Sequence, residues 1–161
     1  MTSPSVVTLG ETMALVRTTE IGSLRHANSL AFGIGGAESN VAIGLVRLGI
    51  PTSWLGRVGD DSLGERVARE IRGDGVDVRA IVDPDAATGL MVKERPSAAS
   101  TAVHYYRAGS AGSRLRPEDL PADGSNTPPC CTSPASLPCC PTRPRPPCTS
   151  RSTGRAQPEP G

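Results

Sequence analysis

The sequence predicts an α/β fold in which helices cover a parallel sheet and a small second β-sheet lies beside it. Short apolar runs alternate with amphipathic helical patterns up to about residue 82, and this strand–helix–strand–helix–strand order is typical of parallel sheets. Glycine-rich turns separate these segments. Additional short strand patterns lie outside that order, and they predict the second sheet.

The predicted strands are short apolar or alternating runs. The first of them ends at Gly10 and has the composition of a buried strand. The last two are spaced as in a hairpin. The predicted strands span residues 5–9, 13–17, 30–34, 52–58, 76–82, 89–93 and 102–107.

The first predicted helix covers residues 38–48. Gly49 stands just beyond its end and Pro51 follows, which is the usual helix stop. Its apolar side comprises Val41, Leu45 and Leu48, with Ala42 and Val46 beside them.

The second predicted helix follows Asp61 and ends at residue 73. Asp61 is a suitable N-cap, and Leu63, Val67 and Ile71 recur every four residues on one face. The neighbouring carboxylates of Asp60 and Asp61 could suggest an acid pair. Adjacent acids at a helix start more often serve capping and the helix dipole, so we expect a structural role.

The composition changes near residue 124. All five cysteines and ten of the sixteen prolines lie beyond it, and Leu137 is the one large aliphatic residue from 125 to 161. Such a segment buries too little apolar surface to fold, so we expect residues 1–124 to form the folded part and residues 125–161 a disordered tail. Its Pro, Cys, Ser, Thr and Arg mixture resembles a GC-rich gene read out of frame, and we favour a frameshifted or truncated reading over an evolved tail.

Charge and composition exclude several classes of protein. A net charge of +1 gives no reason to expect nucleic acid or a membrane surface as a partner. The N-terminus lacks the pattern of a signal peptide, and no run approaches the ~18 apolar residues of a membrane span. The cysteines form vicinal pairs without CxxC spacing, and no metal-ligand spacing surrounds His26 or His104, so no metal site is expected. A cysteine-free folded part fits a cytoplasmic protein.

The turn Gly33-x-Gly35-Gly36-Ala37-Glu38 stands between a predicted strand and a helix. A dinucleotide fingerprint needs Gly or Ala where Glu38 stands, and no Walker lysine follows. The glycines could instead bring backbone N–H groups close to a polar ligand, with Asn40 offering a donor and an acceptor to a sugar hydroxyl. A tight turn with Asn40 as a helix cap fits the same residues.

The longer spacing around this turn resembles the first signature of the ribokinase (PfkB) family of sugar kinases. The residues that carry the resemblance are Asn40-x-Ala42-x6-Gly49-x9-Gly59 and Gly59-x-Asp61-x-x-Gly64. The form GGAExN is similar to the 2-keto-3-deoxygluconate kinase branch. Gly10-Glu11, Thr88-Gly89-Leu90 and the run from Tyr105 to Ser113 agree with that branch.

The resemblance implies a ribokinase-like, Rossmann-type sheet with helices on both faces and a small β-sheet lid. It implies ATP-dependent phosphorylation of 2-keto-3-deoxygluconate with Mg²⁺. Three alternatives stay open. The chain could come from another PfkB kinase such as a fructokinase, it could be a non-catalytic sugar-acid-binding fragment, or it could be a product without a stable fold. The lid strands are also a candidate surface for homo-oligomer formation in the full-length enzyme. The implied substrate contacts are Met13, Gly36, Ala37, Asn40, Met91, Tyr105 and Arg107.

Tyr105 and Arg107 suit a sugar acid, which is a small-molecule partner. In a strand the two side chains share a face while Tyr106 points away. A guanidinium can hold a carboxylate with two parallel N–H bonds, although a solvated Arg107 on an exposed strand fits the pattern too. The family's catalytic base and phosphate cradle lie in a GAGD segment, which these 161 residues do not contain. We therefore expect no catalytic residue, no metal site and no good ATP site in this chain.

Overall fold

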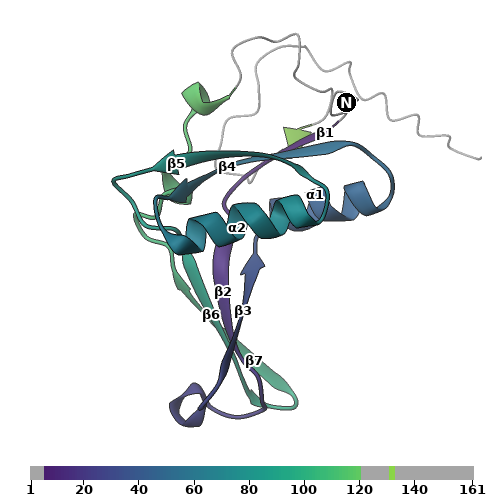
Figure 1. Cartoon of the computed structure of the whole chain (residues 1–161). Coiled ribbons are helices and arrows are strands. Elements are labelled where there is room, and N and C mark those ends of the chain that lie inside the picture. The colour runs from purple at the N-terminus through teal and green to yellow at the C-terminus, as the bar shows by residue number, and fades with distance from the viewer. Residues whose placement is uncertain (1–5, 121–130, 133–161) are drawn as a thin grey trace, which may run out of the picture.

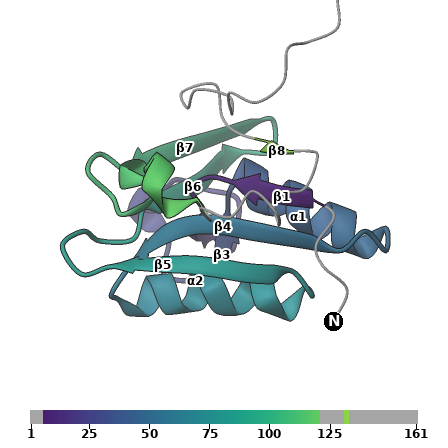
Figure 2. The same ribbon diagram turned by 90° about the horizontal axis from the view of Figure 1, so that it is seen from above.

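The computed structural model describes residues 6–120 and 131–132 as two β-sheets and two α-helices. All strands of the central sheet run parallel, in the order β5-β4-β1-β8. Figure 2 shows β5, β4 and β1 side by side. The strands of this sheet are β1 Val6–Leu9, β4 Thr52–Gly59, β5 Asp77–Asp83 and β8 Cys131–Thr132.

The second sheet, which we call the lid sheet, extends away from the central sheet (Figure 1). Its order is β3-β2-β6-β7; β2 and β6 are parallel, and the outer pairs are antiparallel. The predicted small sheet and its hairpin are thus confirmed, although the hairpin strand β6 continues four residues beyond its expected end at residue 93, to Ser97. The strands are β2 Met13–Thr18, β3 Leu30–Gly35, β6 Leu90–Ser97 and β7 Ser100–Tyr106.

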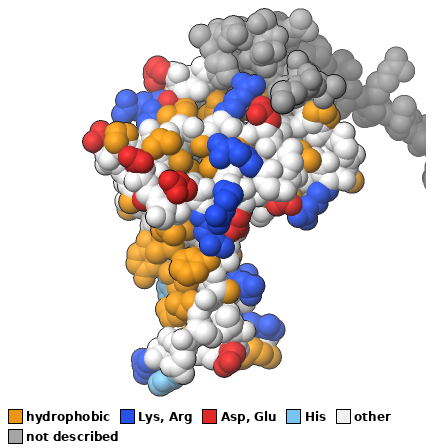
Figure 3. Space-filling model, in the orientation of Figure 1, with side chains coloured by type: hydrophobic (Ala, Val, Ile, Leu, Met, Phe, Trp, Pro, Cys, Tyr) orange, Lys and Arg blue, Asp and Glu red, His pale blue; other side chains and the backbone are white. Residues whose placement is uncertain are grey.

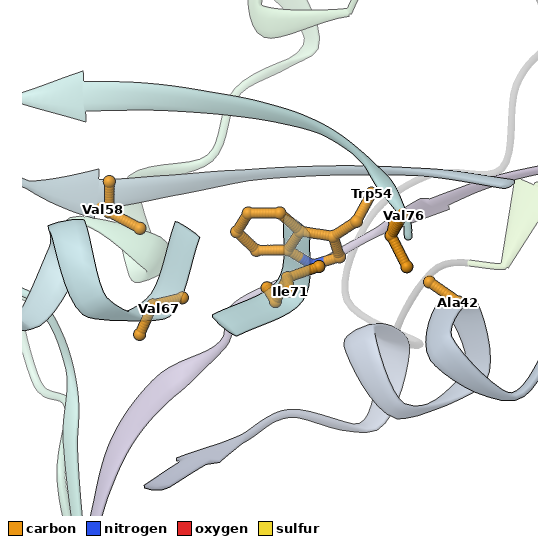
Figure 4. Close-up of a cluster of buried hydrophobic side chains, with 6 residues drawn as sticks. All are labelled: Ala42, Trp54, Val58, Val67, Ile71 and Val76. Atoms are coloured by element: carbon orange, nitrogen blue, oxygen red, sulfur yellow. The ribbon is translucent and has the colours of Figure 1, made fainter. Parts of the chain in front are cut away.

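The helices α1 Ala37–Arg47 and α2 Ser62–Gly73 follow the prediction closely. Both cover the same face of the central sheet (Figure 1). The chain passes from β1 to β4 and from β4 to β5, each time to the next strand in the same direction along the sheet. Because such crossovers are right-handed, both helices are placed on one face. Helices on the opposite face, which the resemblance implies, are not found among the described residues. The core between sheet and helices consists of Ala42, Trp54, Val58, Val67, Ile71 and Val76 (Figure 4).

The buried side of α1 differs from the expected one. Val41 is exposed, and Leu48 is 78% exposed at the helix end. Ala42 lies in the core with Trp54 and Val46 packs against that core, as expected, and Ile43, outside the predicted apolar side, packs there as well. Because α1 carries apolar residues on several sides, its sequence pattern did not select one face.

On the opposite face of β4, ion pairs hold the segment around Asp119. The Arg57 guanidinium forms two parallel 2.7 Å bonds to the Asp119 carboxylate and a 3.2 Å bond to Asp83. Asp119 ends the 3-10 helix Pro117–Asp119; two further 3-10 turns of the same length lie at Leu24–His26 and Gly112–Arg114. The hydrogen bonds from Arg57 hold the pKa of Asp119 below its ordinary value, against the effect of burial.

Most of the expected tail lies outside the described residues. Cys131 and Thr132 pair with Val7 and Thr8 of β1, so these two residues of the tail take strand structure. The expectation of disorder for residues 125–161 as a whole stays a prediction, as does the domain boundary at residue 124. Within the described ranges, no helix is both long and apolar enough to span a membrane.

Candidate sugar-binding site

The predicted contact residues gather where the chain passes between the two sheets. Gly36, Ala37 and Asn40 begin α1, and Arg107 follows the last residue of β7. Across the lid sheet, Tyr105 lies opposite Met91, and Met91 opposite Leu15. Opposed residues point to the same face of a sheet.

Met91 and Met13 line this face in different ways. The Met91 methyl group occupies the space that a Cβ on Gly35 would need, so Met91 reaches towards the start of α1. Met13 lies opposite Gly35 and packs on Gly89, but it is only 6% exposed. Met13 therefore supports the site from beneath and offers a ligand little surface.

Gly36 is the N-cap residue of α1 in an extended conformation, and no side chain caps this helix. A Cβ here would lie 2.7 Å from the Glu11 carbonyl oxygen and 2.7 Å from the Thr12 hydroxyl. The glycine thus permits close packing of two chain segments. The first amides of α1 remain without a side-chain acceptor, which suits an oxygen-rich ligand.

Asn40 does not serve as the cap that a structural interpretation of this turn assigned to it. It lies in the first turn of α1, is exposed, and makes no side-chain hydrogen bond within the described part of the chain. Tyr105 is also exposed, on the same face as Met91, whereas Tyr106 pairs with Leu90 and points to the other face, as predicted. Both Asn40 and Tyr105 are therefore accessible to a ligand.

Arg107 pairs with the carboxylate of Glu11, which is not among the predicted contact residues. Its Nη2 lies 2.7 Å from Oε2 of Glu11, and the hydroxyl of Ser110 donates to Oε1 of Glu11 at 2.5 Å. The Glu11 side chain is 4% exposed, whereas that of Arg107 is 51% exposed. One feature of the sequence could have indicated Glu11: it is an acidic residue directly after a buried strand, between Gly10 and Thr12.

Asp61 joins the base of the lid sheet to α2. Its carboxylate accepts hydrogen bonds from the Gly64 amide and from the amide and hydroxyl of Thr88, each at 2.8 Å. Thr88 also accepts from the Gly59 amide at 2.9 Å. Burial alone would raise the pKa of Asp61, but these hydrogen bonds outweigh it and lower the pKa. The expected capping role of Asp61 is confirmed, and it explains the spacing Gly59-x-Asp61-x-x-Gly64.

A hollow of about 370 Å³ lies elsewhere, between α2 and the other face of the lid sheet. Phe32 forms one wall; it pairs with Val16 and thus points away from the face that carries Met91 and Tyr105. Arg66 of α2 lies over its ring, 5.5 Å from the centroid. Figure 3 shows hydrophobic side chains gathered on this side of the lid sheet, below a row of Lys or Arg side chains. The hollow is lined by Phe32, Ser62, Leu63, Glu65, Arg66 and Arg69.

The described residues contain no group of His, Cys, Asp and Glu side chains that could hold a metal ion. His104 instead lies 3.4 Å from the Glu94 carboxylate on the lid sheet. Glu94 also accepts from the Leu24 amide at 2.7 Å, so it joins β6 to the first 3-10 turn.

Comparison with known proteins identifies the family. Residues 3–123 match the pfkB family carbohydrate kinases. The chain is 40% identical over 119 residues to the 2-dehydro-3-deoxygluconokinase of Bacillus subtilis, and 40% identical over 119 residues to the 2-dehydro-3-deoxygalactonokinase of Haloferax volcanii. Both alignments cover 73% of this chain and 37% of the relative.

The solved structures agree with this result. The crystal structure of a PfkB protein from Polaromonas superimposes with a TM-score of 0.70 and 35% identity, over 74% of this chain and 40% of that one. The ribokinase-like α/β fold expected from the sequence is thereby confirmed. This chain therefore belongs to the PfkB family of carbohydrate kinases.

Proposed function

We propose that these residues form the sugar-binding part of a kinase that phosphorylates 2-keto-3-deoxygluconate with ATP and Mg²⁺. In the parent reaction a sugar hydroxyl would attack the γ-phosphate. Residues of this chain would bind the sugar acid, with Arg107 on its carboxylate, Tyr105 and Asn40 on its oxygens, and the start of α1 beneath it.

The half-exposed guanidinium of Arg107 is the observation that carries this proposal. Its Nη2 is held by Glu11, which leaves other N–H donors of the fork open to solvent. A carboxylate is the group that such a fork binds best. A neutral ketose has no carboxylate, so it would gain little binding free energy from this arginine.

The relatives support a sugar acid as the substrate. The names of the kinases from Bacillus subtilis and Haloferax volcanii both denote keto-deoxy sugar acids. The chain covers 37% of their length, and the GAGD segment is not among its residues. Binding, rather than turnover, is therefore the property to measure in this chain.

The experiment compares binding of 2-keto-3-deoxygluconate and of fructose to the 161-residue chain by NMR titration, before and after Arg107→Leu. Losing a charge-assisted hydrogen bond should cost about 1.5–3 kcal/mol, which is roughly 10- to 150-fold in affinity for the sugar acid. Affinity for fructose should change little. The matched control is Arg69→Leu, an exposed arginine of α2 on the other side of the lid sheet.

If Arg107→Leu lowers the affinity for both sugars equally, Arg107 is structural, and a neutral-sugar kinase such as a fructokinase is favoured. A loss of sugar-acid binding on Arg69→Leu instead would move the site to the hollow beside α2.

A further inference from the structure

Glu11 lies where several of the described connections between the two sheets come together. It belongs to the link between β1 and β2, and its side chain fills the space above Gly89, which leads into β6, and Gly112, which follows β7. Its carbonyl oxygen contacts Gly36, which leads from β3 into α1. A side chain packed against two glycines in this way has little room to change its conformation.

The contacts of Glu11 divide between its two carboxylate oxygens. Oε1 accepts the 2.5 Å hydrogen bond from Ser110, while Oε2 faces Nη2 of Arg107 at 2.7 Å. That second contact is an ion pair without hydrogen-bond geometry, and Oε2 receives no other donor from the described residues. Glu11 is thus the fixed member of the pair, and the half-exposed Arg107 is the member that can move.

We propose that Glu11 is a positioning residue, which holds the Arg107 guanidinium at the base of the lid sheet so that its free N–H edge meets the substrate carboxylate. This inference rests on the proposed function. A long arginine side chain loses considerable rotamer freedom when it binds a ligand. The ion pair with Glu11 orders the guanidinium before the ligand arrives and lowers that cost. Glu11 itself is buried and touches no ligand.

Glu11→Gln separates positioning from packing. The glutamine has the same shape, and its Oε1 can still accept from Ser110. The glutamine is neutral, so the ion pair with Arg107 is lost in either orientation of its amide. The control is Ser110→Ala, which removes the other hydrogen bond and leaves the ion pair in place. Glu11→Asp keeps the charge but withdraws it by one methylene, and it serves if the glutamine variant does not fold.

The measurement is the affinity of the 161-residue chain for 2-keto-3-deoxygluconate and for fructose, by NMR titration of each variant. We expect Glu11→Gln to lower the affinity for the sugar acid about tenfold and the affinity for fructose less than about twofold. Ser110→Ala should keep the preference for the acid, and Glu11→Asp should lose part of it. In Glu11→Gln/Arg107→Leu the loss should equal that of Arg107→Leu alone, because Glu11 acts through Arg107.

Three results would overturn the inference. Glu11→Gln could lower the affinity for both sugars equally, the losses of affinity could be additive in the double variant, or Glu11→Gln could bind the sugar acid more tightly. The last result would mean that Glu11 competes with the substrate. Failure of the proposed function appears earlier, in the unmodified chain. If that chain shows no preference for the sugar acid, the proposed substrate is wrong and this inference falls with it.

Discussion

Asp61 provides a strong test of how the lid sheet is joined to the rest of the fold. Asp61→Ala removes the N-cap of α2, which typically costs about 0.5–2 kcal/mol. It also leaves the amide of buried Thr88 without an acceptor, which costs about 1–3 kcal/mol. Because the same carboxylate makes all these bonds, the terms overlap, and we expect a loss of roughly 2–4 kcal/mol in the free energy of unfolding.

The assay is urea unfolding of the full chain, followed by circular dichroism at several pH values. The pKa of Asp61 is lower in the folded chain than its ordinary value of 3.8. Its contribution is therefore complete above that value and is lost as the pH falls through the folded pKa. The stability difference between the parent and Asp61→Ala should shrink as the pH is lowered from 5 towards about 3.

Asp60→Ala is the matched control, since Asp60 is exposed and, among the described residues, only its backbone amide is bonded, to the Asp83 carbonyl at 3.3 Å. It should change stability by less than about 0.5 kcal/mol. If both variants lose the same stability, or if the deficit of Asp61→Ala does not depend on pH, the described role of Asp61 is wrong.

Three further substitutions test ion pairing and packing by the same unfolding assay. Arg57→Leu should cost about 3–5 kcal/mol, because it leaves the buried Asp119 carboxylate without its bidentate partner and Asp83 with only a 3.8 Å contact to Arg114; a loss below 1 kcal/mol would contradict this ion-pair cluster. Gly36→Ala should destabilise the chain by about 1–3 kcal/mol, since its Cβ would meet the Glu11 carbonyl at 2.7 Å. Gly44→Ala, in the middle of α1 with nothing within 4 Å, should instead stabilise by about 0.5–1 kcal/mol, and equal effects at the two glycines would refute the packing argument.

The order of elements could be predicted from the sequence because its signals are local. Hydrophobic periodicity, the N-cap at Asp61 and the stop at Gly49 each depend on neighbouring residues, and the corresponding elements are present. The buried side of α1 could not be predicted in the same way. Val41 and Leu48 are as apolar as Ile43 and Val46, and only packing against Trp54 decides which of them is covered.

The ion pair between Glu11 and Arg107 could not be predicted, because it depends on a contact between residues far apart in the sequence. Glu11 and Arg107 are 96 positions apart, and the fold brings them together at the base of the lid sheet. The sequence shows a glutamate after a strand and an arginine on another. It does not show that the carboxylate is enclosed by Gly89 and Gly112, which fixes the position of its partner.

The location of the bound sugar acid tests the central claim most directly. The measurement is an NMR titration of the unmodified 161-residue chain with 2-keto-3-deoxygluconate, in which the amide shifts of every described residue are followed. We predict saturable shifts at Gly36, Ala37, Asn40, Tyr105 and Arg107, at the start of α1 and the base of the lid sheet. Shifts confined to the hollow between α2 and the lid sheet, or no saturable shift at any of these five residues, would contradict the account.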